Sequence, residues 1–149
     1  APATPAPAQA QPAMEPAPAQ SQPPAAPQPA AAPAVDTAAL RALGEQVYGA
    51  QCNRCHGVDG MGTPDLYPPL KGSKTVADAD FTQQIRNILN GLVAEPIDGK
   101  TYFGAMPAMA GILSDEEIAA VIYFERTSWG NQATAFPTAA DVKRVRDEQ

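Results

Sequence analysis

Cys52-Asn53-Arg54-Cys55-His56 is the stretch that decides how this chain of 149 residues folds. Two thiols three positions apart, near the end of a helix, can each add across one of the two vinyl groups of a haem. The adjacent imidazole can then coordinate the iron from one side of the ring. The run therefore predicts one covalently attached haem c, with Cys52 and Cys55 as attachment points and His56 as the proximal iron ligand.

Three other uses of a Cys-x-x-Cys pair stay open but are disfavoured. A structural zinc ion needs four ligands, and the chain has only two cysteines and one histidine, all in this motif. A thioredoxin-like redox pair would stand in a βαβ pattern, which the sequence does not show. A structural disulfide across so short a loop would remove little entropy from the unfolded chain.

Residues 1–35 differ sharply in composition from the rest of the chain. They are almost wholly Ala, Pro and Gln, they hold most of the 17 prolines, and Glu15 is their only charge. Such a segment has too few large apolar groups to offset the entropy of ordering it. The sequence therefore predicts a disordered linker over 1–35, able to reach roughly 100 Å when extended, followed by one folded domain over 36–149.

Charge and hydropathy narrow the class of partner. The net charge of −6 and the isoelectric point near 4.6 argue against binding to nucleic acid or anionic lipid. No run of 18 apolar residues is present, so the sequence predicts no membrane span, and an anchor upstream of Ala1 stays open. Because haem is attached to thiols in the bacterial periplasm or an equivalent compartment, the motif predicts a periplasmic location.

Hydrophobic periodicity predicts an all-α domain of three to five helices with one small hairpin. Apolar residues at three- and four-residue steps predict a helix that starts at Asp36 or Thr37 and ends at the cysteine motif. Ser114 and Glu117 predict a capping box that starts another helix, which ends near Gly130. The other predicted elements are a loop over 58–73, a helix from Asp78 or Asp80 to about Gly91, a hairpin over 96–102 and a tail helix over 138–146.

The second axial position of the iron decides between a carrier and a catalyst. An open position would allow ligand binding or catalysis, whereas a sixth ligand gives an electron carrier. No second histidine is available, and two of the four methionines are poorly placed, one in the linker and one too soon after the motif: Met14 and Met61. We favour Met106 as the ligand because Gly104 and Pro107 can fix its loop, and we expect Met109 to pack against the haem or the core.

These residues together resemble the class I cytochrome c family over residues 36–131. Gly44-x-x-x-Tyr48 on the first predicted helix and Tyr123 on the last are similar to a glycine and aromatic residues that pack crosswise in that family. Pro68-Pro69-Leu70 resembles a Pro-x-Leu element whose proline carbonyl accepts a hydrogen bond from the proximal histidine, twelve positions earlier here. The resemblance implies the class I cytochrome c fold around one haem, with Pro68 orienting His56.

A softer resemblance concerns a bacterial subgroup. This subgroup occurs as domains of haem-copper terminal oxidases, as domains of quinoprotein dehydrogenases, and as free small cytochromes. The similar segments are Gly99-Lys100-Thr101-Tyr102, Met106-Pro107-Ala108-Met109, Leu113-Ser114-Asp115-Glu116-Glu117-Ile118 and Ser128-Trp129-Gly130-Asn131. The subgroup more often places an aromatic residue where this chain has Met109, so the packing beside the ligand loop departs from the pattern.

The resemblance and the ligand prediction together imply an electron carrier rather than an enzyme. Met ligation favours a relatively high potential. We expect a membrane complex or a dehydrogenase as electron donor and a terminal oxidase or reductase as acceptor. Two alternatives stay open. One is the electron-accepting domain of a quinoprotein dehydrogenase; the other is a haem peroxidase or gas-sensing module, which is disfavoured because no spare histidine is available for acid–base chemistry.

Overall fold

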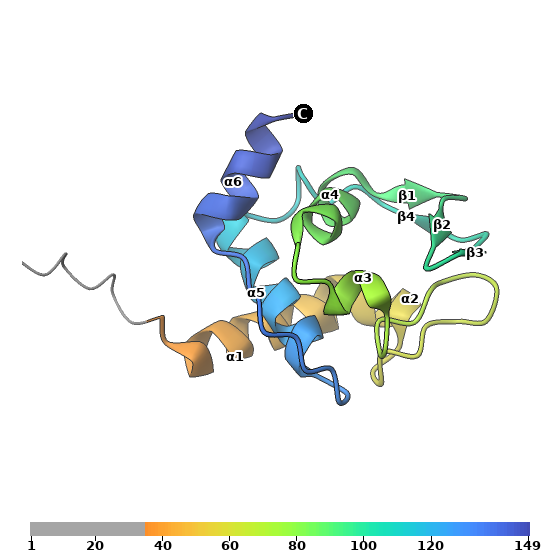
Figure 1. Cartoon of the computed structure of the whole chain (residues 1–149), viewed down its shortest axis with the longest axis horizontal. Helices are drawn as coiled ribbons and strands as arrows, with labels where there is room; N and C mark the ends of the chain where they lie inside the picture. Colours follow the sequence, from red (N-terminus) through yellow and green to blue (C-terminus); the bar gives the residue numbers. More distant parts are fainter. Residues whose placement is uncertain (1–34) are drawn as a thin grey trace, which may run out of the picture. The chain divides into compact units, whose positions relative to one another are not determined.

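The computed structural model describes residues 35–149, and helices are its main elements (Figure 1). The helices are α1 (Thr37–Val47), η1 (Tyr48–Cys52), α2 (Asn53–His56), α3 (Lys74–Ala77), α4 (Thr82–Asn90), α5 (Asp115–Thr127) and α6 (Ala139–Asp147). The strands are β1 (Leu92–Val93), β2 (Pro96–Ile97), β3 (Lys100–Thr101) and β4 (Ala105–Met106). Because α1, η1 and α2 follow one another without a break, residues 35–149 hold five separate helical stretches, and the predicted all-α class is confirmed.

The predicted linker over residues 1–35 lies outside the described residues, except for Val35. The boundary between a linker and a domain starting at residue 36 therefore stays a prediction. Within residues 35–149, no helix combines the length and the apolar character that a membrane crossing would need.

The first helix begins where the sequence predicts and carries the cysteine motif at its end. The carboxylate of Asp36 caps it by accepting hydrogen bonds from the backbone N–H groups of Ala38 and Ala39. At η1 the helix widens into one π turn, in which the N–H of Asn53 donates to the carbonyl of Tyr48. Gly57, with φ of 77°, ends the helix directly after the motif.

The crossing of α1 and α5 is the main packing contact of the domain. A Cβ atom on Gly44 would lie 2.8 Å from Cβ of Phe124 and would overlap the carbonyl oxygen of Ala120, so only glycine permits this approach. The ring of Tyr48 packs 5.3 Å from that of Phe124, centroid to centroid. The crosswise packing is thus present, but with a different aromatic residue on α5 from the one that the sequence suggested.

The suggestion of Tyr123 for this packing was wrong by one position. The ring of Tyr123 packs instead against Phe136, at 4.8 Å between centroids. The reason is helical phase: Ala120 and Phe124 are four residues apart and share the face of α5 that meets α1, whereas one position along a helix turns a side chain by about 100°.

Helices α4 and α6 complete the core. Ile85 and Leu89 of α4 and Val142 and Val145 of α6 are fully buried in one cluster with the apolar residues of α5. The predicted tail helix is confirmed, and a capping box between Thr138 and Asp141 starts it. The capping box predicted at Ser114 and Glu117 is likewise present at the start of α5, which ends at Thr127.

The strands form two antiparallel pairs of minimal length. The predicted hairpin is confirmed as β2 paired with β3, and its turn residues Asp98 and Gly99 have φ of 51° and 85°. The second pair, β1 with β4, was not predicted. Helix α3 was not predicted either: it is capped by Ser73, and the carboxylate of Asp98 accepts a hydrogen bond of 2.8 Å from the N–H of Lys74.

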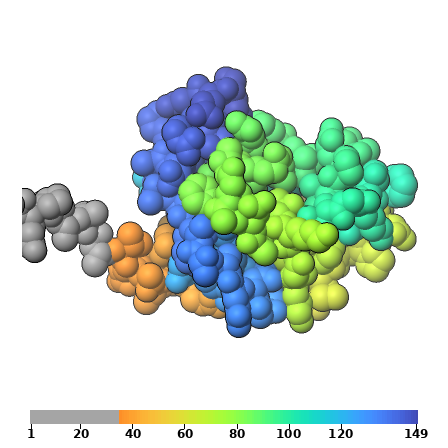
Figure 2. All heavy atoms as spheres, viewed as in Figure 1, coloured from red at the N-terminus to blue at the C-terminus, as the bar shows by residue number. Residues whose placement is uncertain are grey.

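The predicted loop after the cysteine motif lies against the hairpin region at one end of the domain, where Figure 2 shows the yellow and teal segments together. Two backbone hydrogen bonds join them, from Phe103 N–H to the Asp65 carbonyl at 2.9 Å and from Gly104 N–H to the Leu66 carbonyl at 2.8 Å. This contact closes one end of the space between the helices, and that space is the candidate site.

Candidate haem site

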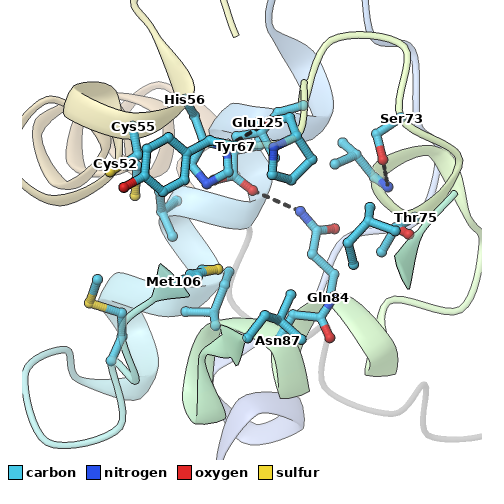
Figure 3. A pocket seen from close by; sticks show the side chains of 18 of the residues that line it. Cys52, Cys55, His56, Tyr67, Ser73, Thr75, Gln84, Asn87, Met106 and Glu125 are labelled. Carbon is cyan, nitrogen blue, oxygen red and sulfur yellow. Dashed lines mark hydrogen bonds between the residues drawn. The ribbon is translucent and has the colours of Figure 1, made fainter. Parts of the chain in front are cut away.

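One cavity brings together all five of the sequence-predicted site residues. Its volume is about 860 Å³, including the part open to solvent, and its walls come from η1, α2, α4, α5 and the segments on either side of them. Figure 3 shows the arrangement of the labelled side chains around this space. The predicted site residues that line it are Cys52, Cys55, His56, Pro68 and Met106.

The imidazole of His56 is buried and oriented by the backbone. Its Nδ1 lies 2.9 Å from the carbonyl oxygen of Pro68. Because a carbonyl oxygen only accepts, Nδ1 carries the proton and donates, which leaves the lone pair of Nε2 free to bind a metal. Burial lowers the pKa of His56, and the hydrogen bond to Pro68 opposes that shift. The neutral, metal-binding form of the ring is therefore favoured.

The two thiols of the motif lie along the same cavity and are not joined to each other. Burial, followed by the nearby charge of Glu125, raises the pKa of the Cys52 thiol above its usual range, so this group is held in the protonated form. Within the described residues, no three His, Cys, Asp or Glu side chains gather as a metal site.

Met106 is carried by β4, and in Figure 3 it lies on the side of the cavity away from His56. The pairing of Met106 with Leu92 in the β1–β4 ladder fixes its backbone. Gly91, with φ of 68°, packs tightly beneath: a Cβ there would lie 2.7 Å from the N atom of Ala108. A half-buried methionine is thereby presented to the cavity from a short, hydrogen-bonded edge.

Met109 lies deeper than Met106. It belongs to the buried core, and its N–H donates a 2.9 Å hydrogen bond to the carbonyl of Ile88 at the end of α4. Its side chain also lines the cavity. The expectation that Met109 packs in the core is confirmed, whereas the choice of Met106 as ligand stays a prediction.

The loop after the motif is held by hydrogen bonds from Tyr48 in η1 and from Trp129 and Asn131, which follow α5. The hydroxyl of Tyr48 donates to the carbonyl of Gly57 at 2.6 Å, and the indole of Trp129 donates to the carbonyl of Val58 at 2.9 Å. Asn131 donates from its amide to the carbonyl of Leu70 at 3.1 Å. These bonds hold the segment that places Pro68 over His56.

Sequence reasoning missed a polar group inside the cavity, Glu125. This side chain on α5 is only 4% exposed, and its Oε2 accepts a 2.8 Å hydrogen bond from Nε2 of Gln84 on α4. Burial raises the pKa of Glu125 to about 7, against the opposing effects of that hydrogen bond and of Arg126. The signal was present: Glu125 continues the buried stripe of Ile118, Val121 and Ile122 at three- and four-residue spacing.

The residues of the cavity fit a haem c. Two free thiols, an imidazole whose Nε2 can donate a lone pair and a thioether sulfur all border one space whose other walls are mainly apolar. Thiols can hold the porphyrin through its vinyl groups, and imidazole with thioether is a known axial pair for haem iron.

The chain is similar in sequence to a cytochrome family and to cytochrome c subunits of known enzymes. A family model described as cytochrome C oxidase, cbb3-type, subunit III matches residues 39–124. The cytochrome c subunit of alcohol dehydrogenase (quinone) from Gluconacetobacter polyoxogenes is 39% identical over 104 residues, which cover 70% of this chain and 22% of that protein. The gluconate 2-dehydrogenase cytochrome c subunit of Pantoea cypripedii is 35% identical, over 71% of this chain and 24% of that protein.

A smaller relative is matched over most of its length. Cytochrome c-552 of Thermus thermophilus is 36% identical over 117 residues, which cover 73% of this chain and 78% of that protein. The chain thus spans about a fifth to a quarter of the dehydrogenase subunits but most of this cytochrome. From the family match and these relatives, the chain belongs to the cytochrome c family and is an electron carrier with a covalently bound haem c.

Proposed function

We propose that this domain is a periplasmic one-electron carrier whose single haem iron is held between His56 and Met106. The observation that carries the proposal is the placing of the His56 imidazole and the Met106 side chain on two sides of one cavity that also contains both thiols. When bound, the haem supplies an iron centre that can gain and lose one electron without any covalent bond being formed or broken.

Each of the five residues has one role in the proposed site. Cys52 and Cys55 hold the porphyrin through thioether bonds, and His56 coordinates the iron through Nε2. The protonated Nδ1 donates a hydrogen bond to the Pro68 carbonyl at 2.9 Å, which fixes the plane of the ring and makes Nε2 a stronger ligand for the iron. Met106 supplies a soft sulfur, which raises the reduction potential relative to a second imidazole.

The partners are proposed from the chain and its relatives. A positively charged docking partner suits the net charge of −6. We propose that the domain passes electrons to, or within, a respiratory terminal oxidase or reductase. The matches to cytochrome subunits named for quinone-type alcohol dehydrogenase and gluconate 2-dehydrogenase favour a second context, the electron-accepting domain of a quinoprotein dehydrogenase.

The periplasmic location and the domain division belong to the same proposal. Attachment of haem to thiols requires maturation in the periplasm or an equivalent compartment. A flexible linker over residues 1–35 joined to a domain over 36–149 would let the haem domain move between a donor and an acceptor while staying tethered. Limited proteolysis of the holoprotein, followed by mass spectrometry, tests the boundary, with cleavage expected before residue 36.

Absorption spectra with two matched variants test the ligand assignment. The reduced protein is expected to be low-spin and slow to bind carbon monoxide. Met106→Leu should become high-spin and bind carbon monoxide promptly, because leucine has no donor atom. Met109→Leu, the matched control, should keep the spectrum of the parent protein. A Met106→Leu variant that stays low-spin and unreactive would overturn the assignment, and prompt carbon monoxide binding by the parent protein would favour a gas-binding or peroxidase site instead.

A further inference from the structure

A buried chain of three polar side chains ends inside the haem cavity. Nε of Arg126 donates to Oε1 of Gln84 at 2.8 Å, and Nε2 of Gln84 donates to Oε2 of Glu125 at 2.8 Å. Because an arginine only donates, the amide oxygen of Gln84 must face Arg126, and its NH₂ group must therefore face Glu125. The orientation of Gln84 is fixed from behind, and Glu125 is left with a dedicated donor.

Arg126 donates hydrogen bonds to Gln84 and to two backbone carbonyls, and none to Glu125. Its side chain is 0% exposed, and its Nη1 donates to the carbonyl of Asp78 at 2.7 Å and to the carbonyl of Ala135 at 2.9 Å. Among the hydrogen bonds of the described residues, the carboxylate of Glu125 accepts from the neutral Gln84 rather than from a cation. A buried carboxylate with a neutral partner is costly to ionise.

The charged and titratable groups around Glu125 are few. From η1, Tyr48 and Cys52 feel its charge, and in both the pKa is raised, first by burial and then by Glu125. From α4, Gln84 is neutral, and on α5 Arg126 is the nearby cation. Burial lowers the pKa of Arg126, and the charges of Asp78, Glu125 and Asp80 oppose that shift. The pKa of about 7 for Glu125 means that small changes in local charge switch its protonation near neutral pH.

Glu125 and Gln84 both line the cavity that takes the haem, and Figure 3 shows them joined across it. Ferric haem carries one more positive charge than ferrous haem. In a poorly polarisable interior this extra charge favours the ionised form of a carboxylate beside it, and its loss favours the protonated form. By linkage, a proton on the carboxylate favours reduction of the iron by the same factor.

We propose that Glu125 takes up one proton from solvent when the haem iron takes up one electron, and releases it on reoxidation, so that electron transfer by this domain is coupled to proton transfer. This inference rests on the proposed electron-carrier function. The electron comes from the donor redox protein, which is oxidised as ferric iron becomes ferrous. The proton converts the carboxylate to a carboxylic acid, and no bond to the haem is made or broken.

The test is the midpoint potential of the holoprotein, followed spectroscopically at a series of pH values that span neutrality. Between the pKa values of Glu125 in the ferric and ferrous states, the equilibrium constant for reduction should fall by up to tenfold for each pH unit, which is 59 mV for one electron. Glu125→Gln keeps the shape and can still meet Gln84, but it cannot ionise. Its potential should be independent of pH in this range and should match the low-pH value of the parent protein.

Two further variants make the test specific. Glu116→Gln removes an exposed carboxylate from the same helix and should keep the pH dependence of the parent protein. Gln84→Met removes the donor that lowers the pKa of Glu125, so the pH-dependent interval should move to higher pH. A redox difference infrared spectrum should show a carboxylic acid band that is lost in Glu125→Gln.

Three results would overturn the proposal. A parent potential independent of pH would do so, and so would a pH dependence that persists unchanged in Glu125→Gln, because another group, such as a haem propionate, would then be responsible. In both cases a low-spin spectrum with methionine ligation would leave the electron-carrier function standing. A high-spin spectrum in the parent protein would instead overturn both.

Discussion

The two sides of the haem cavity are built in contrasting ways. The proximal region, residues 37–72 together with α5, holds His56 by an unbroken helix, a close helix crossing at Gly44 and a loop tied down by long-range hydrogen bonds. The distal segment, residues 91–113, holds Met106 by two-residue strands and turns. Two of its apolar side chains, Val93 and Phe103, are 70% and 76% exposed.

This contrast predicts which ligand leaves the iron first. Helix packing and burial resist local opening, whereas a short ladder at the surface can open with little loss of buried apolar area. In the distal segment the backbone packs closely at two glycines: a Cβ atom on Gly91 would overlap the carbonyl oxygen of Met106, and one on Gly104 would overlap the ring of Tyr67. We therefore expect Met106 to leave the iron well before the domain unfolds, with His56 still bound.

Removal of the covalent anchor in the proximal region should damage the protein most. In a Cys52→Ala/Cys55→Ala variant no thioether can form, and the cavity loses the group that fills it. We expect no haem on a denaturing gel and loss of the folded holoprotein, measured by mass spectrometry and circular dichroism. Met61→Leu, at an exposed position five residues after His56, is the control and should retain covalent haem. Haem retained through denaturation by the double variant would contradict the assignment.

The helix crossing is the next most sensitive point. Gly44→Val should lower the free energy of unfolding by about 3 kcal/mol, since neither the Ala120 backbone nor Phe124 can yield without separating α1 from α5. Chemical denaturation of the ferric protein measures it. Gly49→Ala is the matched control, because nothing lies within 4 Å of a Cβ there, and it should be neutral or stabilising. Equal effects of the two substitutions would refute the crossing.

The pH dependence of stability tests the burial of Glu125 in the proximal region. Its pKa rises from 4.5 to about 7 on folding, so the folded state binds the proton more tightly than the unfolded state. Protonation of Glu125 therefore stabilises the folded state fully at pH values below the unfolded-state pKa of 4.5. This stabilisation is lost as the pH rises from 4.5 through about 7. Relative to Glu125→Gln, the ferrous parent protein should lose at most about 3 kcal/mol across this range. A constant difference would mean that Glu125 is solvated.

A smaller and more local effect is expected in the distal segment. Gly91→Ala forces a side chain into a backbone with φ of 68° and against Pro107 and Ala108. We expect a cost of about 1–2 kcal/mol, visible as earlier loss of the iron–methionine absorption band during denaturation, with less change in the global transition. Gly111→Ala, where a Cβ would meet nothing within 4 Å, should leave both transitions in place. A shift of the global transition alone would contradict the contrast between the two regions.

The smallest effect is expected from the cap of α5. Ser114→Ala removes one hydrogen bond from the side-chain oxygen to the N–H of Glu117, at 3.2 Å, and should cost about 1 kcal/mol of unfolding free energy. Thermal unfolding measures it, and Ser114→Asp, which can still cap, should restore stability. This cap joins the distal segment to α5. If Ser114→Ala lost the iron–methionine absorption band without a change in global stability, the cap would act on the loop that carries Met106 rather than on the helix.

Much of the proximal region could be predicted from the sequence because its signals are local. Asp36, the Ser114–Glu117 pair and Gly57 each act within one turn of the helix that they start or end. The crossing partner was misassigned to Tyr123 rather than Phe124 because two adjacent aromatic residues satisfy the same motif. Only the phase of the folded helix distinguishes them.

The distal segment was predicted less well because its structure depends on distant residues. Strands of two residues have no period to detect, so the pairing of Leu92 with Met106 left no trace in the sequence. Helix α3 depends on the carboxylate of Asp98, 24 positions after Lys74. All five predicted site residues do line one cavity, whereas the bond between Gln84 and Glu125 joins two helices 41 positions apart and needed the fold.

The single wide turn of η1 sets the angular register of cofactor attachment. A π turn holds one residue more than an α turn, so every residue after it is turned by about 100° from where an uninterrupted α-helix of the same sequence would place it. If residues 48–52 formed an α turn instead, the cysteine pair would face a different direction relative to α5. The π turn is therefore as much a part of the haem-binding apparatus as the thiols themselves.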